Sequence, residues 1–189
     1  MNPISSLAID IPHSLLAQAK AGDHAAFERI YRLFERPVYT LCLRLTGDRS
    51  LAQDALQESM FRVFDRIAEY RADAPFWAWL RQVSVNEALM LMRKRRRLQE
   101  LASDSTETEL SVADCEISNS ALSNKNLLAA IQQLPSVTRS VLWLYHVEGY
   151  THEEISHSMD RTVSFSKSQL ARGTQKLRQL LQVAEFSHA

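Results

Sequence analysis

Apolar residues recur every three or four positions along most of the chain, which is the spacing of one buried face on an α-helix. The pattern predicts helices over residues 14–20, 24–46, 51–69 and 75–97. Shorter helices are expected between residues 125 and 158, and a longer one from residue 162. Because the chain has only four glycines and five prolines, its composition also favours helices over a turn-rich β fold. The sequence therefore predicts an all-α protein.

Residues that favour helix ends mark several of these boundaries. Asp23 is predicted to cap the second helix, and Gly47 is predicted to end it. Pro37 lacks an amide hydrogen and should kink or restart that helix. Asp48 or Ser50 is expected to cap the third helix.

The stretch over residues 75–97 combines tryptophans with a run of five cations. Its apolar positions have the spacing of a buried stripe: Phe76, Leu80 and Val83. Trp79, Asn86 and Arg93 are seven residues apart and so share another face. Such a row can stack on a base, hydrogen-bond a base edge and neutralise phosphate. The same pattern also fits a core helix with packed tryptophans and a solvated basic end.

The helix over residues 51–69 has two distinct faces. The expected core stripe is Ala52, Ala55, Leu56, Ser59, Val63 and Ile67. The opposite side holds an acidic-aromatic patch: Asp54, Gln57, Glu58 and Phe61. An exposed aromatic beside charges often marks a partner surface. The alternative is a solvated face with Phe61 covered by a neighbouring loop.

The net charge of zero conceals an uneven distribution. Residues 1–97 have 15 Lys and Arg against 11 Asp and Glu, and residues 125–189 have seven against five. Residues 98–124 contain six acidic residues and no Lys or Arg. The neutral total is thus weak evidence against nucleic-acid binding, because the cations are locally concentrated. The polar acidic segment is predicted to be a flexible linker.

The block after the linker has the order and lengths of a helix-turn-helix. Thr151 and Glu154 form a capping-box pattern, and a turn at residues 159–161 follows a short helix. Thr162 is expected to cap the next helix. Outward-facing positions near its start are Ser164, Phe165, Lys167, Ser168, Gln169 and Arg172, whereas Leu170, Leu177 and Leu181 face inward. An ordinary helical hairpin is the alternative.

Other features limit the possible classes of protein. Cys42 and Cys115 are isolated, and no metal-binding cluster, phosphate-binding glycine loop or paired nucleophile is present, which disfavours an enzyme. No apolar run has the length to cross a bilayer, and the first residues lack the regions of a signal peptide. A cytoplasmic protein without metal or cofactor is expected.

Short motifs occur in the same order as in one bacterial family. In the first block they lie at residues 26–31 (A-F-x-x-I-Y), 44–48 (R-x-T-G-D), 54–61 (D-x-x-Q-E, then Phe61), 76–86 (F-x-x-W-L-x-x-V-x-x-N) and 93–97. In the second block they lie at residues 134–144 (L-P-x-x-x-R-x-V-x-x-L), 148–156 (E-G-x-T-x-x-E-I-S) and 167–178. Together these motifs resemble sigma factors of the extracytoplasmic-function (ECF) type in the sigma-70 family, because their joint order is specific.

The resemblance implies a two-domain, all-helical transcription initiation factor. Its domains would span residues 14–97 and 125–184, joined by the acidic linker at 98–124, with tails at 1–13 and 185–189. It would bind core RNA polymerase, recognise the −10 and −35 elements of a promoter and help to melt the duplex. An anti-sigma factor is a further partner that the resemblance implies.

The resemblance also assigns roles to residues of this chain. The acidic-aromatic patch would dock onto polymerase. Recognition of the −10 element and melting of the duplex would involve Tyr70, Arg71, Asp73, Trp79, Asn86, Arg93, Lys94, Arg95, Arg96 and Arg97. Asn86 and the loop at residues 70–75 would hold an extruded base. The basic run would hold phosphates. The −35 element would be bound by Thr162, Ser164, Phe165, Lys167, Ser168, Gln169 and Arg172, with Gln169 the best candidate for a base edge.

This chain differs from the family pattern mainly in the helix-turn-helix. The turn is Met-Asp-Arg at residues 159–161 in place of the usual Leu-Gly-Ile, and aspartate tolerates the left-handed conformation that a turn needs. Ser158 and Ser166 replace aliphatic residues, which should soften a small core, and Gly173 replaces an alanine.

Two other protein classes fit the residues alone: a stand-alone helix-turn-helix regulator and a helical adaptor that sequesters another protein.

Overall fold

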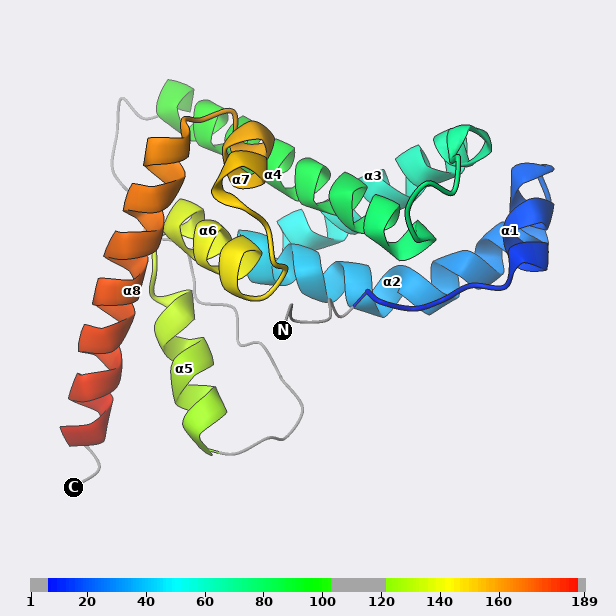
Figure 1. Ribbon diagram of the computed structural model, residues 1–189. Helices are drawn as coiled ribbons and strands as arrows, with labels where there is room; N and C mark the ends of the chain where they lie inside the picture. Colours follow the sequence, from blue (N-terminus) through cyan, green and yellow to red (C-terminus); the bar gives the residue numbers. More distant parts are fainter. Residues whose placement is uncertain (1–6, 103–121, 187–189) are drawn as a thin grey trace. The chain divides into compact units, whose positions relative to one another are not determined.

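The computed structural model describes residues 7–102 and 122–186, and within these ranges all regular secondary structure is helical (Figure 1). The elements are α1 (His13–Lys20), α2 (His24–Thr46), α3 (Arg49–Arg66), η1 (Ile67–Glu69), α4 (Phe76–Ala102), α5 (Leu122–Gln132), α6 (Ser136–His146), α7 (His152–Met159) and α8 (Val163–Phe186). The chain divides into two compact units, with α1 to α4 in the first and α5 to α8 in the second. None of the described helices is long and apolar enough to cross a membrane.

The first unit is built on α2, which packs against both α3 and α4 (Figure 1). Asp23 caps α2 as predicted, since its carboxylate accepts from the amides of Ala25 and Ala26 at 2.8 and 3.3 Å. One face of the helix is buried along its whole length: Ala26, Ile30, Phe34, Val38, Leu41, Cys42 and Leu45. Burial of this stripe supplies the main driving force for the packing.

Pro37 does not restart the second helix, which excludes one of the two effects that the sequence predicts for it. Helix α2 runs through it without interruption from residue 24 to 46. The carbonyl that loses its amide partner belongs to Leu33, which lies on the solvent-facing side and is 42% exposed. Water can therefore replace the lost hydrogen bond, while the buried stripe on the other side holds the helix together.

Helix α3 begins immediately after α2 because two capping residues adjoin. Gly47 ends α2 in the left-handed conformation, at φ 67°, and Asp48 caps α3 by accepting from the Leu51 amide at 2.9 Å. All six residues of the predicted core stripe of this helix are buried, Ser59 included. The hydroxyl of Ser59 is satisfied by the carbonyl of Ala55 at 2.5 Å.

Helix α4 starts at the predicted place but extends five residues beyond the basic run, to Ala102. Phe76 and Leu80 are buried as expected, whereas Val83 is only half-buried because the buried face includes Ser84 and Val85 instead. Both ends of the linker predicted at residues 98–124 are helical, because α4 continues to residue 102 and α5 begins at residue 122. Its middle, the first six residues and the last three lie outside the described residues.

In the second unit α8 packs against α5, α6 and α7. Helix α6 is its centre, with every residue from 138 to 144 buried, Thr138, Arg139 and Ser140 among them. Burial lowers the pKa of the Arg139 guanidinium from its ordinary value. Leu170, Leu177 and Leu181 of α8 are half-buried, so this face is less enclosed than predicted.

The helix-turn-helix geometry forms as the sequence predicts. Thr151 and Glu154 make a complete capping box at the start of α7. Asp160 takes the left-handed conformation, at φ 53°, in the turn that follows. Thr162 caps α8 by accepting from the Phe165 amide at 3.2 Å. The unusual turn sequence is therefore compatible with the fold.

Gly173 allows α8 to approach α6 closely. A Cβ atom at this position would lie 2.6 Å from Leu142 Cδ1 and 2.7 Å from Thr138 Cγ2. Both distances are shorter than carbon atoms tolerate without movement, and Thr138 is also held by a hydrogen bond to Gln169. The glycine is thus a packing requirement of this unit.

Replacing Gly173 with alanine is predicted to destabilise the second unit. Overpacking of this kind costs about 1–3 kcal/mol, and the better helix propensity of alanine offsets about 1 kcal/mol of it. We expect a net loss of about 1 kcal/mol in the free energy of unfolding, measured by calorimetry of the full chain. Gln175→Ala, at an exposed position of the same helix, is the control and should not destabilise. A Gly173→Ala protein that unfolds at or above the wild-type temperature would show that α6 and α8 adjust freely.

Candidate nucleic-acid and protein interfaces

Three aromatic residues form a cluster where the loop at residues 70–75 enters α4. The Tyr70 ring stacks on Trp79, with centroids 5.3 Å apart, and meets Phe76 edge to face at 5.6 Å. Phe76 in turn contacts Phe34 of α2 at 5.6 Å. Tyr70 is buried, so this predicted site residue belongs to the core beneath the loop rather than to its surface.

The loop itself has a defined conformation. The Tyr70 hydroxyl donates to the carbonyl of Ala74 at 2.5 Å, and Ala72 has a left-handed backbone at φ 61°. Burial, followed by the charge of Asp73, raises the pKa of the Tyr70 phenol. Arg71 and Asp73 are exposed, as a surface that contacts a ligand requires.

A residue that the sequence analysis did not identify also contacts this loop. Lys20, the last residue of α1, donates from Nζ to the Tyr70 carbonyl, and the same Nζ lies 5.3 Å from the centroid of the Tyr70 ring. The two residues are fifty positions apart. No spacing or motif in the sequence could have joined them.

The predicted row along α4 has the expected exposure. Trp79 is half-buried, and Asn86 and Arg93 are exposed. The Asn86 side-chain oxygen accepts from Gln82 Nε2 at 3.1 Å, so the amide is oriented while its nitrogen remains on the surface. The tryptophan is therefore a partly covered support, and the polar members of the row face solvent.

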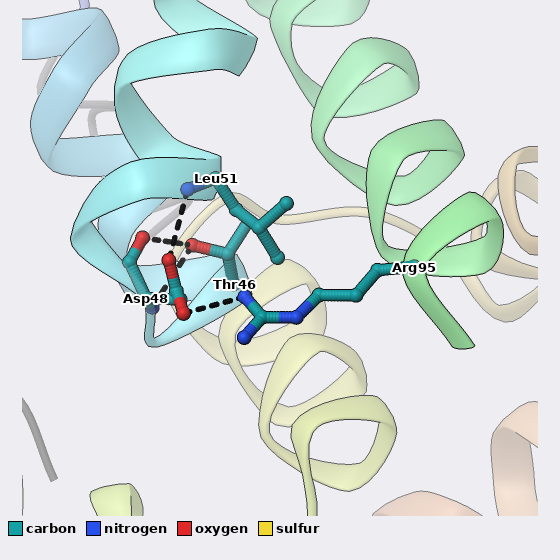
Figure 2. A network of polar contacts seen from close by, with 4 residues as sticks. All are labelled: Thr46, Asp48, Leu51 and Arg95. Atoms are coloured by element: carbon teal, nitrogen blue, oxygen red, sulfur yellow. Dashed lines mark hydrogen bonds and ion pairs between the residues drawn. The ribbon is translucent and has the colours of Figure 1, made fainter. Parts of the chain in front are cut away.

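The five cations at the end of α4 are not equivalent. Arg95 Nη1 donates to Asp48 Oδ2 at 2.5 Å, and the other oxygen of the same carboxylate caps α3 (Figure 2). Thr46 closes the network, because its hydroxyl accepts from the Asp48 amide and donates to the Asp48 carbonyl (Figure 2). Arg95 thus ties the basic end of α4 to the start of α3, a contact that the sequence did not predict.

The pKa of the Asp48 carboxyl reflects this network. Burial alone would raise it, but the amides of Leu51 and Ser50 and the Arg95 guanidinium outweigh burial and lower the pKa below its ordinary value.

Arg96 pairs with Glu100 at 2.6 Å on the exposed surface. Arg93, Lys94 and Arg97 are exposed and make the solvent-facing part of the basic run.

The acidic-aromatic patch of α3 is a surface feature. Phe61 is 66% exposed, which excludes the alternative that a loop covers it. Asp54 and Gln57 are exposed and Glu58 is half-buried. A large apolar ring held in water beside carboxylates is typical of a surface that a partner covers.

An ion-pair network that the sequence analysis did not predict lies under the edge of this patch. Arg62 Nε lies 2.8 Å from Glu87 Oε1 of α4 and 3.6 Å from Glu58 Oε1. Burial raises the pKa of the Glu87 carboxyl, and Arg62 opposes that shift. The network links α3 to α4 and fixes Glu58 next to Phe61.

The predicted DNA-facing residues of α8 divide into two groups. Ser164, Lys167 and Arg172 are exposed, whereas Phe165, Ser168 and Gln169 are half-buried. The Arg161 guanidinium lies 5.9 Å from the Phe165 ring, and the Ser168 hydroxyl donates to the Phe165 carbonyl at 2.9 Å.

Gln169 differs most from the expectation. Its Oε1 accepts from the Thr138 hydroxyl of α6 at 2.7 Å, so the side chain lies against the unit's own core rather than facing outward. His152 of α7 is half-buried as well. It contacts Ser166 at 2.9 Å through Nδ1 and stacks on Tyr145. Ser166, which replaces an aliphatic residue, thus contributes to a hydrogen bond between α7 and α8.

The part of the chain that the structure describes contains no group of three potential metal ligands. The exposed features are an acidic-aromatic patch, an aromatic-supported loop with a basic run, and a helix-turn-helix with outward cations. These surfaces suit binding to protein and nucleic acid.

Comparison with known families identifies both units. The family described as Sigma-70 region 2 matches residues 30–98, and the family described as Sigma-70, region 4 matches residues 124–177. The two matches follow the first and second units. This result favours an initiation factor over a stand-alone regulator or an adaptor.

Several characterised relatives cover nearly the whole chain. The chain is 30% identical to the RNA polymerase sigma factor CarQ of Myxococcus xanthus, over 89% of this chain and 96% of CarQ. It is 28% identical to the ECF RNA polymerase sigma factor SigW of Bacillus subtilis, over 88% and 94%. It is also 30% identical to the ECF RNA polymerase sigma factor SigE of Mycolicibacterium smegmatis, over 85% of this chain but only 64% of SigE.

Solved structures have the same fold at lower identity. The sigma factor RpoE in its complex with the anti-sigma factor NepR from Bartonella quintana is 23% identical, with a TM-score of 0.61 over 83% of this chain and 97% of that chain. CnrH, in complex with the cytosolic domain of CnrY, is 20% identical with a TM-score of 0.51, over 90% and 96%. Sequence, order of units and fold agree, and the chain belongs to the ECF RNA polymerase sigma factors of the sigma-70 family.

Proposed function

We propose that this sigma factor docks on core RNA polymerase through the acidic-aromatic patch of α3 and brings both units to promoter DNA. The observation that supports this most directly is Phe61, a large apolar side chain 66% exposed beside Asp54 and Glu58. Burying that ring in an interface would yield about 1.5–3 kcal/mol. The surrounding carboxylates would add electrostatic complementarity to a basic partner surface.

The first unit is proposed to bind the −10 element and stabilise the melted state. A base extruded from the duplex needs a surface with stacking and polar groups that offsets a few kcal/mol of unstacking. The exposed side chains of Arg71, Asp73 and Asn86 would contact this base. Trp79 and the buried Tyr70 would support the surface from below.

The basic end of α4 is proposed to hold DNA phosphates through its solvent-facing members. Arg93, Lys94 and Arg97 are exposed. Arg96 pairs with Glu100 on the exposed surface, and phosphate would compete with this carboxylate for the guanidinium. Arg95 is engaged by Asp48 and would serve to orient the others. Phosphate contacts of this kind give affinity and register rather than sequence preference.

The second unit is proposed to place the start of α8 in the major groove of the −35 element. Thr162, Ser164, Lys167 and Arg172 would contact DNA from exposed positions. Phe165 and Ser168 would shape the helix start. Gln169, which the sequence alone favoured for a base edge, is better suited to holding α8 against α6.

An anti-sigma factor is proposed as a further partner. RpoE and CnrH, which share the fold, were solved in complexes with the anti-sigma factor NepR and the cytosolic domain of CnrY, respectively. The exposed Phe61 would attract such a competitor as well as polymerase. We infer action in the cytoplasm as a binding protein without catalysis of its own.

The overall proposal is tested by transcription with bacterial core polymerase on a library of genomic DNA fragments, with and without the protein. We expect new transcripts whose templates share two spaced sequence elements. Transcripts that do not depend on the protein, together with no binding to core polymerase, would contradict the proposal.

Replacing Phe61 with alanine is predicted to weaken polymerase binding by about tenfold or more, since an interface anchor of this size contributes at least 1–2 kcal/mol. Affinity for core polymerase would be measured by titration, with circular dichroism to check that helix content is unchanged. Leu33→Ala, which removes another exposed apolar side chain from α2, is the matched control and should bind normally. Equal affinity of wild type and Phe61→Ala would remove Phe61 from the interface.

The salt dependence of DNA binding is predicted to separate Arg97 from Arg95. Each lost phosphate contact lowers the slope of log affinity against log salt by about 0.7–0.9, so Arg97→Gln should flatten the slope by that amount. Arg95→Gln should leave the slope nearly unchanged but lower the unfolding temperature. The measurement is holoenzyme binding to one promoter fragment at several salt concentrations. If Arg95→Gln instead flattens the slope as much as Arg97→Gln, Arg95 contacts phosphate.

Substituting Gln169 with alanine is predicted to weaken binding to all −35 sequences by a similar factor, because the side chain supports α8 rather than contacting one base. Thr138→Val, which removes the hydroxyl that donates to Gln169, should give the same pattern. Affinities would be compared on a promoter set with each −35 base pair changed in turn. A selective loss of preference at one base pair in Gln169→Ala alone would show direct contact with that base.

A further inference from the structure

Helix α1 contacts the base-binding end of the first unit from a part of the chain that precedes the family match at residue 30. It packs against α2 and against η1, the turn that leads into the loop at residues 70–75. Its last residue, Lys20, makes two contacts with one partner. The ammonium donates to the Tyr70 carbonyl and lies 5.3 Å from the centroid of the Tyr70 ring.

Tyr70 in turn connects the two ends of the loop. Its carbonyl is held by Lys20 at the start, and its hydroxyl donates to the Ala74 carbonyl at the end, at 2.5 Å. Its ring is fixed between Trp79 and Phe76. The carbonyl, the hydroxyl and the ring of Tyr70 are therefore all held by contacts. Residues 71–75 are exposed and extend from this fixed residue.

The backbone of the loop has a conformation that it would not adopt freely. Ala72 is left-handed at φ 61°, which costs roughly 1–2 kcal/mol for a residue with a Cβ atom. Such a conformation persists only where surrounding contacts impose it. The contacts of Tyr70 lie at the base of this loop, and Lys20 is the member of that set that comes from a distant part of the chain.

We propose that Lys20 is a positioning residue for base recognition, which holds the loop at residues 70–75 in the shape that selects the extruded base. This inference rests on the proposed function of the loop. Lys20 itself would contact the Tyr70 carbonyl and ring and not the DNA. It would determine how well bases are distinguished rather than whether DNA is bound.

A purely structural role for Lys20 would have different consequences. A clamp that only adds stability would lower the unfolding temperature and reduce all activities in proportion. A positioning residue changes the ratio between the correct and incorrect base at one promoter position. The two roles are therefore separated by discrimination, measured as the ratio of transcription rates on templates that differ at that position.

The test uses holoenzyme reconstituted from core polymerase and the full chain, with a promoter from the genomic library and its variants at each −10 position. We expect Lys20→Met, which keeps the side-chain length but not the charge, to reduce discrimination at one position about tenfold, the effect of losing one charge-assisted hydrogen bond. Lys20→Arg should retain it, because guanidinium can make both contacts. Arg36→Met, which removes an exposed charge from α2, should behave as wild type.

Hydrogen exchange of the loop provides a measurement that does not depend on DNA. The amides of residues 71–73 in Lys20→Met should exchange about tenfold faster than in wild type, with no change in α2. Tyr70→Phe, which removes only the hydrogen bond to the Ala74 carbonyl, should have the same effect on both hydrogen exchange and base discrimination. This second variant provides the measurement if Lys20→Met folds poorly.

The possible outcomes separate this inference from the function on which it rests. Unchanged exchange in both variants, or faster exchange with full discrimination, would overturn the role of Lys20. If wild-type holoenzyme itself shows no base preference in the −10 region, the proposed function of the loop fails, and with it the recognition role of Lys20. Faster exchange in that case would leave Lys20 as a structural clamp only.

Discussion

The packing of α4 against α2 and α3 is the constraint on which the first unit depends. Each helix contributes one apolar stripe to a shared core, and Phe34, Phe76 and Leu80 lie where the stripes meet. Because these stripes are inside, the opposite face of every helix is available for binding. The patch on α3 and the polar row on α4 are both consequences of this arrangement.

Charged residues then fix how the helices end. Asp48 caps α3 with one carboxylate oxygen and holds Arg95 of α4 with the other, and Arg62 joins α3 to the buried Glu87. The low pKa of Asp48 means that its stabilising effect is complete above the ordinary carboxyl pKa and is lost as the pH falls through the lower, folded-state value. The start of α3 and the basic end of α4 are thereby held in register at neutral pH.

Local sequence chemistry predicted the helices, the caps at Asp23 and Thr162 and the capping box, because these features depend on residues a few positions apart. The contacts that the sequence does not predict depend on partners far along the chain. Arg95 meets Asp48 across 47 residues, Gln169 meets Thr138 across 31, and Tyr70 is buried by the packing of a whole unit. Helix α2 does not restart at Pro37, because tertiary burial on one side of the helix outweighs the loss of one hydrogen bond on the other.

The close contact at Gly173 has a consequence for how relatives of this protein can vary. The family pattern that the sequence resembles has alanine at this position, and an added methyl group needs space that Leu142 and Thr138 occupy here. Residues 138, 142 and 173 should therefore change together during evolution, with a larger residue on α8 accompanied by a smaller one on α6. Gln169, which is bonded to Thr138, would be drawn into the same exchange. Divergence at α8 would then begin in the core behind it.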